Sequence, residues 1–400
     1  MSSNFQELKL VSTADVYQDG KLAGHLRRQP DGSVEFSYTV EYLASGRKGI
    51  AFSLPASNPT YSVPSGGLPA FFSGLLPEGH RLTVLKNAAK TSLSDELTLL
   101  MIVGADTPGD VSIVPSGRPL TSPPVVAEVL DPAQMDFAAL SRTLDLHSLP
   151  GVQDKISATM LTTPVATREF NYLLKLDTQE HPHLVANEHL HLEGAKKLKI
   201  PTAKSALLRD KNGVEGLLVE RFDRRIGADR TTLTRRRLED AMQVLNLPPS
   251  AKYSISSEEV CLALSEHCHA PLLAVRNLYL QFVYAWLTGN GDLHGKNVSI
   301  LADERERFSV APVYDVPCTL LYGDDTMALT LAGKTKNLKR KHWAQFAGDL
   351  GLNERSANAA NKLALNAAGS VDLNQLPIDG SPLRGAQREL RHRRFELEGQ

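Results

Sequence analysis

The polar stretch at residues 290–297, Asn-Gly-Asp-Leu-His-Gly-Lys-Asn, limits the possible folds of this chain more than any other segment. It follows residues 272–287, a strongly apolar segment whose large side chains recur at helical spacing. We therefore expect a buried helix that ends at Gly289, because glycine readily adopts the left-handed conformation that closes many helices. A loop that leaves a rigid element in this way is a common setting for functional residues.

Three side chains around this loop predict a particular chemistry. Asp292 and Asn297 lie five residues apart, and Asp315 opens a second polar loop after residues 298–310, which have the pattern of two short paired strands. Protein kinases position and neutralise the transferred phosphoryl group with such an aspartate, asparagine and second aspartate, and Mg²⁺ prefers hard oxygen ligands. The Asp292–Asn297 spacing alone is more typical of an ordinary loop. With Asp315, a kinase-like site and an ordinary loop are equally compatible with these residues, and the rest of the chain decides between them.

The composition is that of an ordinary globular protein. The chain has 400 residues, of which 42% are hydrophobic and 22% charged, so it can bury a large core and form two or three lobes. A formal net charge of −1 provides no general attraction to nucleic acid or to an anionic membrane. Three cysteines are too few for a disulfide framework, and neither a signal peptide nor a bilayer-spanning segment is visible. We expect a cytoplasmic protein with no membrane partner.

The first quarter of the chain is expected to contain strands and then helices. Residues 34–42 alternate apolar and polar side chains, which predicts one half-buried strand over the whole segment. Ser92 and Asp95 resemble a capping box, so we expect a helix that begins at Ser92 and ends near Gly104.

An α+β organisation follows for the whole chain. Residues 116–134 are rich in proline and small polar residues, which predicts a linker or surface excursion. We expect Arg235–Arg237 to form a solvated helix start and residues 327–331 to form a strand. The predicted parts are an N-terminal subdomain at 1–115, the remainder of an N-lobe at 116–225 and a helical C-lobe at 226–400.

Two charged residues in apolar segments are candidates for nucleotide binding. Lys175 lies on the predicted strand 170–176, and Glu188 shares a face with apolar residues of the predicted helix 184–198. A carboxylate on a packing face requires a cation, and Lys175 is the candidate, as in the lysine–glutamate pair of protein kinases. A solvated Lys175 and an exposed Glu188 at the helix start are equally compatible with the sequence.

Residues 148–155 form a predicted turn before another alternating segment. Such a turn can present backbone N–H groups to phosphates, but this one contains a single glycine. On the residues alone, an ordinary hairpin is the favoured interpretation.

Taken together and in order, these segments resemble the HipA family of bacterial toxin kinases. The resemblance implies a two-lobed protein-kinase-like fold with a β-rich N-terminal subdomain and a mostly helical C-lobe. It is carried by the following segments: 20–43, 72–79, 103–106, 148–155, 220–224, 247–253, 290–297 and 314–316.

The resemblance also implies roles for individual residues. Asp292 would be the catalytic aspartate, and Asn297 and Asp315 would hold Mg²⁺. Glu188 would support the nucleotide-binding lysine. ATP would be bound by the phosphate loop, by that lysine and by the adenine hinge, which correspond here to Gly151, Val152, Gln153, Lys175, Glu220 and Phe222.

Regulation and partners are implied in the same way. Ser148 matches the family's inhibitory autophosphorylation site, where an added phosphate would repel those of ATP. Pro150 departs from the family pattern and should stiffen the phosphate loop. The family pairs with a small helix-turn-helix antitoxin, HipB-like, which would carry the contact with operator DNA, and its known target class is the aminoacyl-tRNA synthetases.

Two other functions remain open at this level. The 290–297 loop also resembles that of aminoglycoside and choline kinases, although those small-molecule kinases lack a counterpart of residues 1–115. A non-catalytic corepressor that binds the antitoxin and operator DNA is the other alternative, and the intact Asp292, Asn297 and Asp315 argue against it. Basic clusters at 334–341 and 384–394 could face DNA, but short basic runs in a near-neutral protein are usually solvated.

Overall fold

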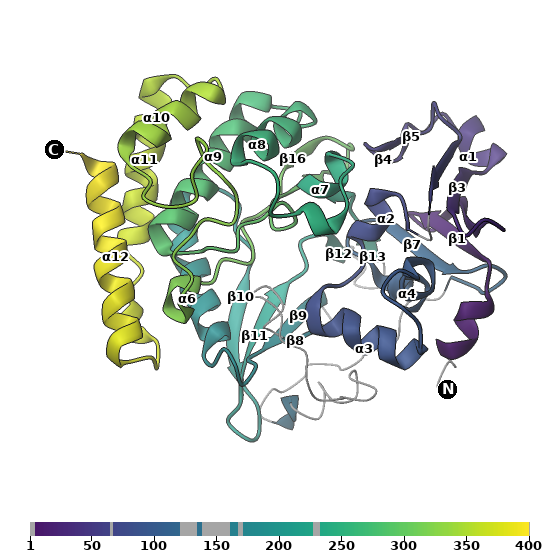
Figure 1. Ribbon diagram of the computed structural model, residues 1–400, viewed down its shortest axis with the longest axis horizontal. Helices are drawn as coiled ribbons and strands as arrows, with labels where there is room; N and C mark the ends of the chain where they lie inside the picture. The colour runs from purple at the N-terminus through teal and green to yellow at the C-terminus, as the bar shows by residue number, and fades with distance from the viewer. Residues whose placement is uncertain are drawn as a thin grey trace.

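The computed structural model describes residues 5–64, 67–120, 134–137, 161–166, 171–226 and 233–399. An N-terminal region built on a five-stranded antiparallel sheet lies at one end of the molecule, and a helical region lies at the other (Figure 1). The order of strands in the N-terminal sheet is β6-β3-β2-β1-β7, with bounds β1 Thr13–Gln18, β2 Lys21–Arg28, β3 Val34–Tyr38, β6 Thr60–Val63 and β7 Val111–Pro115.

The third strand of this sheet is shorter than its sequence pattern predicts. Alternating burial runs through β3 and stops at Tyr38, and α1 (Val40–Ala44) follows at once. The reason is a helix cap, because the Thr39 side chain accepts a hydrogen bond from the backbone N–H of Tyr42. The prediction of a strand extending to Tyr42 is therefore wrong.

Short helices share a hydrophobic core with the N-terminal sheet. These are α2 (Ala70–Gly74), α3 (Gly79–Ala89) and α4 (Glu96–Val103). Asp95, and not Ser92, caps α4, because the Asp95 side chain accepts from the backbone N–H of Thr98. A two-stranded hairpin, β4 (Gly49–Ala51) and β5 (Leu54–Pro55), completes this region.

A second antiparallel sheet lies in the middle of the molecule. Its strand order is β10-β11-β9-β8, and helix α6 (Leu184–Ala195) packs against β10 and β11 (Figure 1). The strand bounds are β8 Leu161–Ala166, β9 Asn171–Leu176, β10 Ser205–Arg209 and β11 Glu215–Glu220.

The C-terminal region surrounds a buried helix, α9 (Pro271–Thr288), which ends at Gly289 with φ +73° as expected. A small sheet of β14, β15 and β16 lies beside it and leads into the loop that contains Asp315. The other elements are α7 Ala241–Val244, α8 Ser257–Glu266, α10 Arg340–Asp349, α11 Glu354–Gly369, α12 Gly380–Glu398, β14 Leu238–Asp240, β15 Ser299–Ala302 and β16 Phe308–Val310. Short 3₁₀ helices occur at Phe5–Leu10, Gly104–Asp106, Lys196–Leu198, Pro249–Ala251, Thr319–Tyr322 and Leu373–Gln375.

Two local predictions in this half of the chain are wrong. Residues 327–331 form only isolated bridges, Thr330 with Ser256 and Leu331 with Lys334, instead of a strand. The Arg235–Arg237 segment is not a solvated helix start, because Arg235 ends β13 (Leu233–Arg235), which pairs with β12 (Arg224–Ile226). The half-buried guanidinium of Arg235 donates to backbone carbonyls of residues 107–111, so its charge is directed into the protein and not into solvent.

The α+β architecture predicted from the sequence is confirmed. In the part of the chain that the structure describes, every helix is too short or too polar to cross a bilayer.

Candidate active site

The loop that follows α9 is held in shape by its own polar groups. The Asn290 side chain accepts from the backbone N–H of Asp292 at 2.9 Å, and the Asn297 side-chain nitrogen donates to the backbone carbonyl of Asp292 at 2.9 Å. Gly291 donates its N–H to Thr319 Oγ1 at 2.7 Å. These bonds satisfy buried backbone groups and set the two ends of the motif at a defined separation.

Asp315 is brought to this loop together with the two charged residues predicted to bind nucleotide. Lys175 Nζ, from β9, lies 2.8 Å from both carboxylate oxygens of Glu188, on α6, and 3.0 Å from Asp315 Oδ1. Burial alone would lower the pKa of Lys175, but the two carboxylates raise it, so the lysine is charged. The Lys175–Glu188 ion pair expected for a kinase-like site is therefore present, and Lys175 forms a second ion pair with Asp315.

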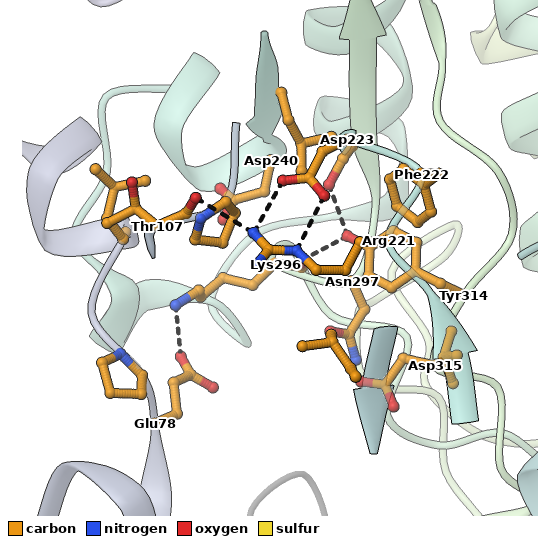
Figure 2. Close-up of a pocket in the computed structure, with 18 of the residues that line it drawn as sticks. Glu78, Thr107, Arg221, Phe222, Asp223, Asp240, Lys296, Asn297, Tyr314 and Asp315 are labelled. Atoms are coloured by element: carbon orange, nitrogen blue, oxygen red, sulfur yellow. Dashed lines mark hydrogen bonds and ion pairs between the residues drawn. The ribbon is translucent and has the colours of Figure 1, made fainter. Parts of the chain in front are cut away.

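A pocket of about 390 Å³ opens beside this cluster. Its walls come from all three parts of the chain: the 74–81 and 103–108 segments of the N-terminal region, the central sheet, and the loops after α9 and β16 (Figure 2). Phe222 and Tyr314 form part of an apolar wall, with ring centroids 5.5 Å apart. The predicted site residues that line the pocket are Lys175, Glu188, Glu220, Phe222, Asn297 and Asp315.

Asp292 does not line the pocket but lies next to it, 6% exposed. Its Oδ1 accepts a hydrogen bond from the Tyr253 hydroxyl at 3.0 Å. Burial, together with the nearby Asp315 carboxylate, raises the pKa of Asp292 to about 7. His294 Nε2 lies 3.8 Å from the same oxygen, and burial followed by the charge of Lys252 lowers the pKa of His294 to about 4, so this imidazole is neutral.

The donor groups of the site fit a magnesium ion bound together with phosphates. The Asn297 side-chain nitrogen donates a hydrogen bond to the backbone carbonyl of Asp292, so the amide oxygen of Asn297 is the atom that can serve as a metal ligand. The second protein ligand would be the Asp315 carboxylate. Among the residues described, no three or more His, Cys, Asp or Glu side chains gather as they would in an all-protein metal site. The remaining ligands would be phosphate oxygens and water, which is how Mg²⁺ is usually held at nucleotide sites.

A further cluster of charged residues at this site was not identified from the sequence. Glu78, from the N-terminal region, forms ion pairs with Lys252 and with Lys296, and both lysines are largely buried. Tyr253, the partner of Asp292, was likewise not identified. No local pattern indicates these contacts, because Glu78 and Lys252 are 174 positions apart in the chain.

A buried ion network lies beside the segment expected to contact adenine, and Asp106, Arg221 and Asp223 of this network line the pocket themselves (Figure 2). Asp223 accepts from Arg224 at 2.7 Å, from Arg221 at 3.3 Å and from the backbone of Gly109 at 2.9 Å. Asp106 accepts from the same two arginines, so residues 106–109 of the N-terminal region are attached to residues 221–224. Burial alone would raise the pKa of Asp223, but the two guanidinium groups lower it to about 2.

Four of the predicted residues lie outside the part of the chain that the structure describes. These are Ser148, Gly151, Val152 and Gln153.

Comparison with known proteins shows the family of this chain. The family model described as HipA-like C-terminal domain matches residues 147–371, and the model described as HipA N-terminal domain matches residues 14–114. The chain is 28% identical to the Sinorhizobium fredii protein named "Putative kinase Y4mE", over 86% of each chain. It is 26% identical to the Serine/threonine-protein kinase toxin HipA of Shewanella oneidensis, over 74% of this chain and 72% of that protein.

The fold agrees with a solved structure over nearly the whole length. HipA from Shewanella oneidensis, solved in a complex with HipB and operator DNA, superposes with a TM-score of 0.74 at 20% identity and covers 95% of this chain and 96% of its own. Because the C-terminal family model alone spans more than half of the residues, the resemblance noted in the sequence is confirmed. The chain belongs to the HipA family and has its kinase-like fold.

Proposed function

We propose that this chain is an ATP- and Mg²⁺-dependent serine/threonine protein kinase that acts as the toxin of a type II toxin–antitoxin module. The observation that supports the proposal most strongly is the cluster of Lys175, Glu188 and Asp315 at the wall of the pocket, with Asn297 beside it. This arrangement is what phosphoryl transfer needs, a fixed cation for phosphates and hard oxygen ligands for a metal.

Each end of the nucleotide has a proposed partner. Glu188 holds Lys175 in place for contact with the phosphates, while Asn297 and Asp315 hold Mg²⁺. Glu220 and Phe222, which line the same pocket, would contact adenine. The metal, when bound, supplies neutralisation of the charge on the transferred phosphoryl group.

Asp292 is the proposed catalytic residue that orients the acceptor hydroxyl and accepts its proton. The Tyr253 hydroxyl fixes one oxygen of this carboxylate, so the other can face the acceptor. Gly151, Val152 and Gln153 are proposed to complete the phosphate site as a backbone loop.

The reaction can be tested by intact mass spectrometry of the purified chain. Incubation of dephosphorylated protein with ATP and Mg²⁺ is expected to add one or more phosphate groups, and omission of Mg²⁺ should prevent the addition. A protein that neither gains mass nor binds ATP in calorimetry would contradict the proposed function.

We expect Ser148→Ala to abolish the main autophosphorylation, because Ser148 is the proposed acceptor in the phosphate loop. Peptide mapping after incubation with ATP and Mg²⁺ would measure this, with the exposed Ser116→Ala as the matched control. A main phosphorylated site elsewhere in the wild type would show that Ser148 is not the acceptor.

The pH dependence of the reaction is expected to follow the ionisation of Asp292. Its pKa is raised to about 7, so below that pH the carboxyl is neutral and cannot accept a proton. The initial rate at low ATP concentration should therefore rise as the pH increases through 7 and level off above it. A rate that is flat from pH 5.5 to 8.5 would exclude Asp292 as the base.

The partners are proposed from the family relationship. Shewanella HipA was solved together with HipB and operator DNA, and we infer a HipB-like helix-turn-helix antitoxin for this chain, with operator DNA contacted through the antitoxin. The proposed substrate is a translation-related protein such as an aminoacyl-tRNA synthetase, encountered in the cytoplasm. Transfer of labelled phosphate from ATP to a panel of purified synthetases would identify it.

A further inference from the structure

Glu78 is placed where a helix-capping residue would be, but its carboxylate is used elsewhere. It occupies the N-cap position of α3, and its side chain makes no capping hydrogen bond. Its Oε2 lies 2.5 Å from Lys252 Nζ and its Oε1 lies 3.2 Å from Lys296 Nζ. One carboxylate of the N-terminal region thus binds two lysines of the C-terminal region.

The two lysines are adjacent to the residues proposed to perform the chemistry. Lys252 precedes Tyr253, which donates to Asp292, and the backbone carbonyl of Lys252 accepts from Gly295 in the 290–297 loop. Lys296 precedes Asn297 in that loop and lines the pocket, and Figure 2 shows its side chain directed toward Glu78. The two ammonium groups therefore share one carboxylate at the edge of the proposed transfer site.

The positions of the Lys252 and Lys296 ammonium groups depend on the negative charge of Glu78. Two ammonium groups repel each other, and a lysine side chain has many rotamers, so neither would keep this position without a shared anion. The side chains of Lys252 and Lys296 are only 12% and 11% exposed, and water therefore screens the pair weakly.

We propose that Glu78 is a positioning residue that holds Lys252 and Lys296 against the phosphoryl group being transferred, so that the N-terminal region completes the active site. The inference rests on the proposed kinase function and adds a residue to it. Two fixed cations at this place would stabilise the charge that develops on the phosphoryl oxygens, as preorganised donors do in other enzymes.

The test is Glu78→Gln, which keeps the size of the side chain and removes its charge. We expect kcat for autophosphorylation to fall by about tenfold or more, because the lysines lose their fixed position. The affinity for ATP should not fall together with kcat. Loss of one negative charge near the terminal phosphate should instead tighten ATP binding about threefold to tenfold relative to ADP binding, as measured by calorimetry with Mg²⁺.

The controls separate positioning from a merely structural role. Glu78→Asp keeps the charge on a shorter side chain and should recover part of kcat, whereas Glu41→Gln, on the exposed first turn of α1, should leave every parameter unchanged. An unchanged kcat, or a parallel loss of kcat, ATP affinity and melting temperature, would show that Glu78 only anchors the N-terminal region and would overturn the proposal.

The two binding constants also distinguish this inference from the proposed function. If the wild type transfers no phosphate but Glu78→Gln tightens ATP selectively over ADP, the kinase proposal fails while the placement of Glu78 near the terminal phosphate stands. If ATP and ADP affinities change equally or not at all, the placement itself is wrong.

Discussion

Asp292→Asn is expected to lower the rate of phosphoryl transfer by about 10³-fold, because an amide cannot accept the proton of the acceptor hydroxyl. The fold should be retained, since asparagine has the same shape and can still accept the hydrogen bond that Tyr253 donates. Loss of the charge should not destabilise the protein either, because burial already raises the pKa of Asp292 to about 7. Intact mass after incubation with ATP and Mg²⁺ would measure the loss.

A matched variant makes this result specific to the site. Asp349→Asn makes the same chemical change at an exposed position at the end of α10 and should keep full activity. Calorimetry should show that Asp292→Asn still binds ATP, because Lys175, Asn297 and Asp315 are unchanged. Retention of more than a few per cent of the wild-type rate would exclude Asp292 as the catalytic residue.

Asp223→Ala is expected to lower the free energy of unfolding by about 3–5 kcal/mol, because it removes one of the two carboxylates that pair with two buried guanidinium groups and so leaves an uncompensated buried charge. Asp223 is 5% exposed and contacts Arg221, Arg224 and the backbone of Gly109. Urea unfolding followed by fluorescence would measure the change. Because the network attaches the N-terminal region beside Phe222 and lines the pocket, nucleotide affinity should fall in the folded variant as well.

The comparison variant removes an acid from an ion pair on the surface. Glu193→Ala breaks the contact between Glu193, on α6, and Lys196, just after the end of α6. Both side chains are more than 40% exposed, so the change should alter the free energy of unfolding by less than about 1 kcal/mol. If Asp223→Ala and Glu193→Ala lower the free energy of unfolding equally, the ion pairs of Asp223 are accessible to water and do not anchor the N-terminal region.

Several elements of the site could be predicted because their signals are local. The apolar spacing of residues 272–287 and the position of Gly289 predicted α9 and its end, which the structure contains at Pro271–Thr288. The strands around residues 298–310 were also predicted, since both are short apolar runs separated by a charged turn. These features depend on periodicity and on single-residue conformational preference, which a sequence displays directly.

Other local predictions failed where a nearby or distant contact outweighed the pattern. The alternation through residues 34–42 continued past Tyr38 although Thr39 caps a helix there. The Arg235–Arg237 run was interpreted as solvated because charge runs usually are, but Arg235 meets carbonyl groups of the 107–111 loop that require donors. A sequence contains no information on which distant carbonyl groups lack partners.

The sequence by itself determined the family and the kinase-like class of fold, because several separate segments resemble those of the family in the same order. It also predicted Asp292, Asn297 and Asp315 as one set of candidate site residues. Only the tertiary structure decided that Lys175 meets both Glu188 and Asp315, and that Glu78 reaches Lys252 across 174 positions. The physical reason is that ion pairs form between whichever charges the packed core brings within about 4 Å, and that packing depends on the whole chain at once.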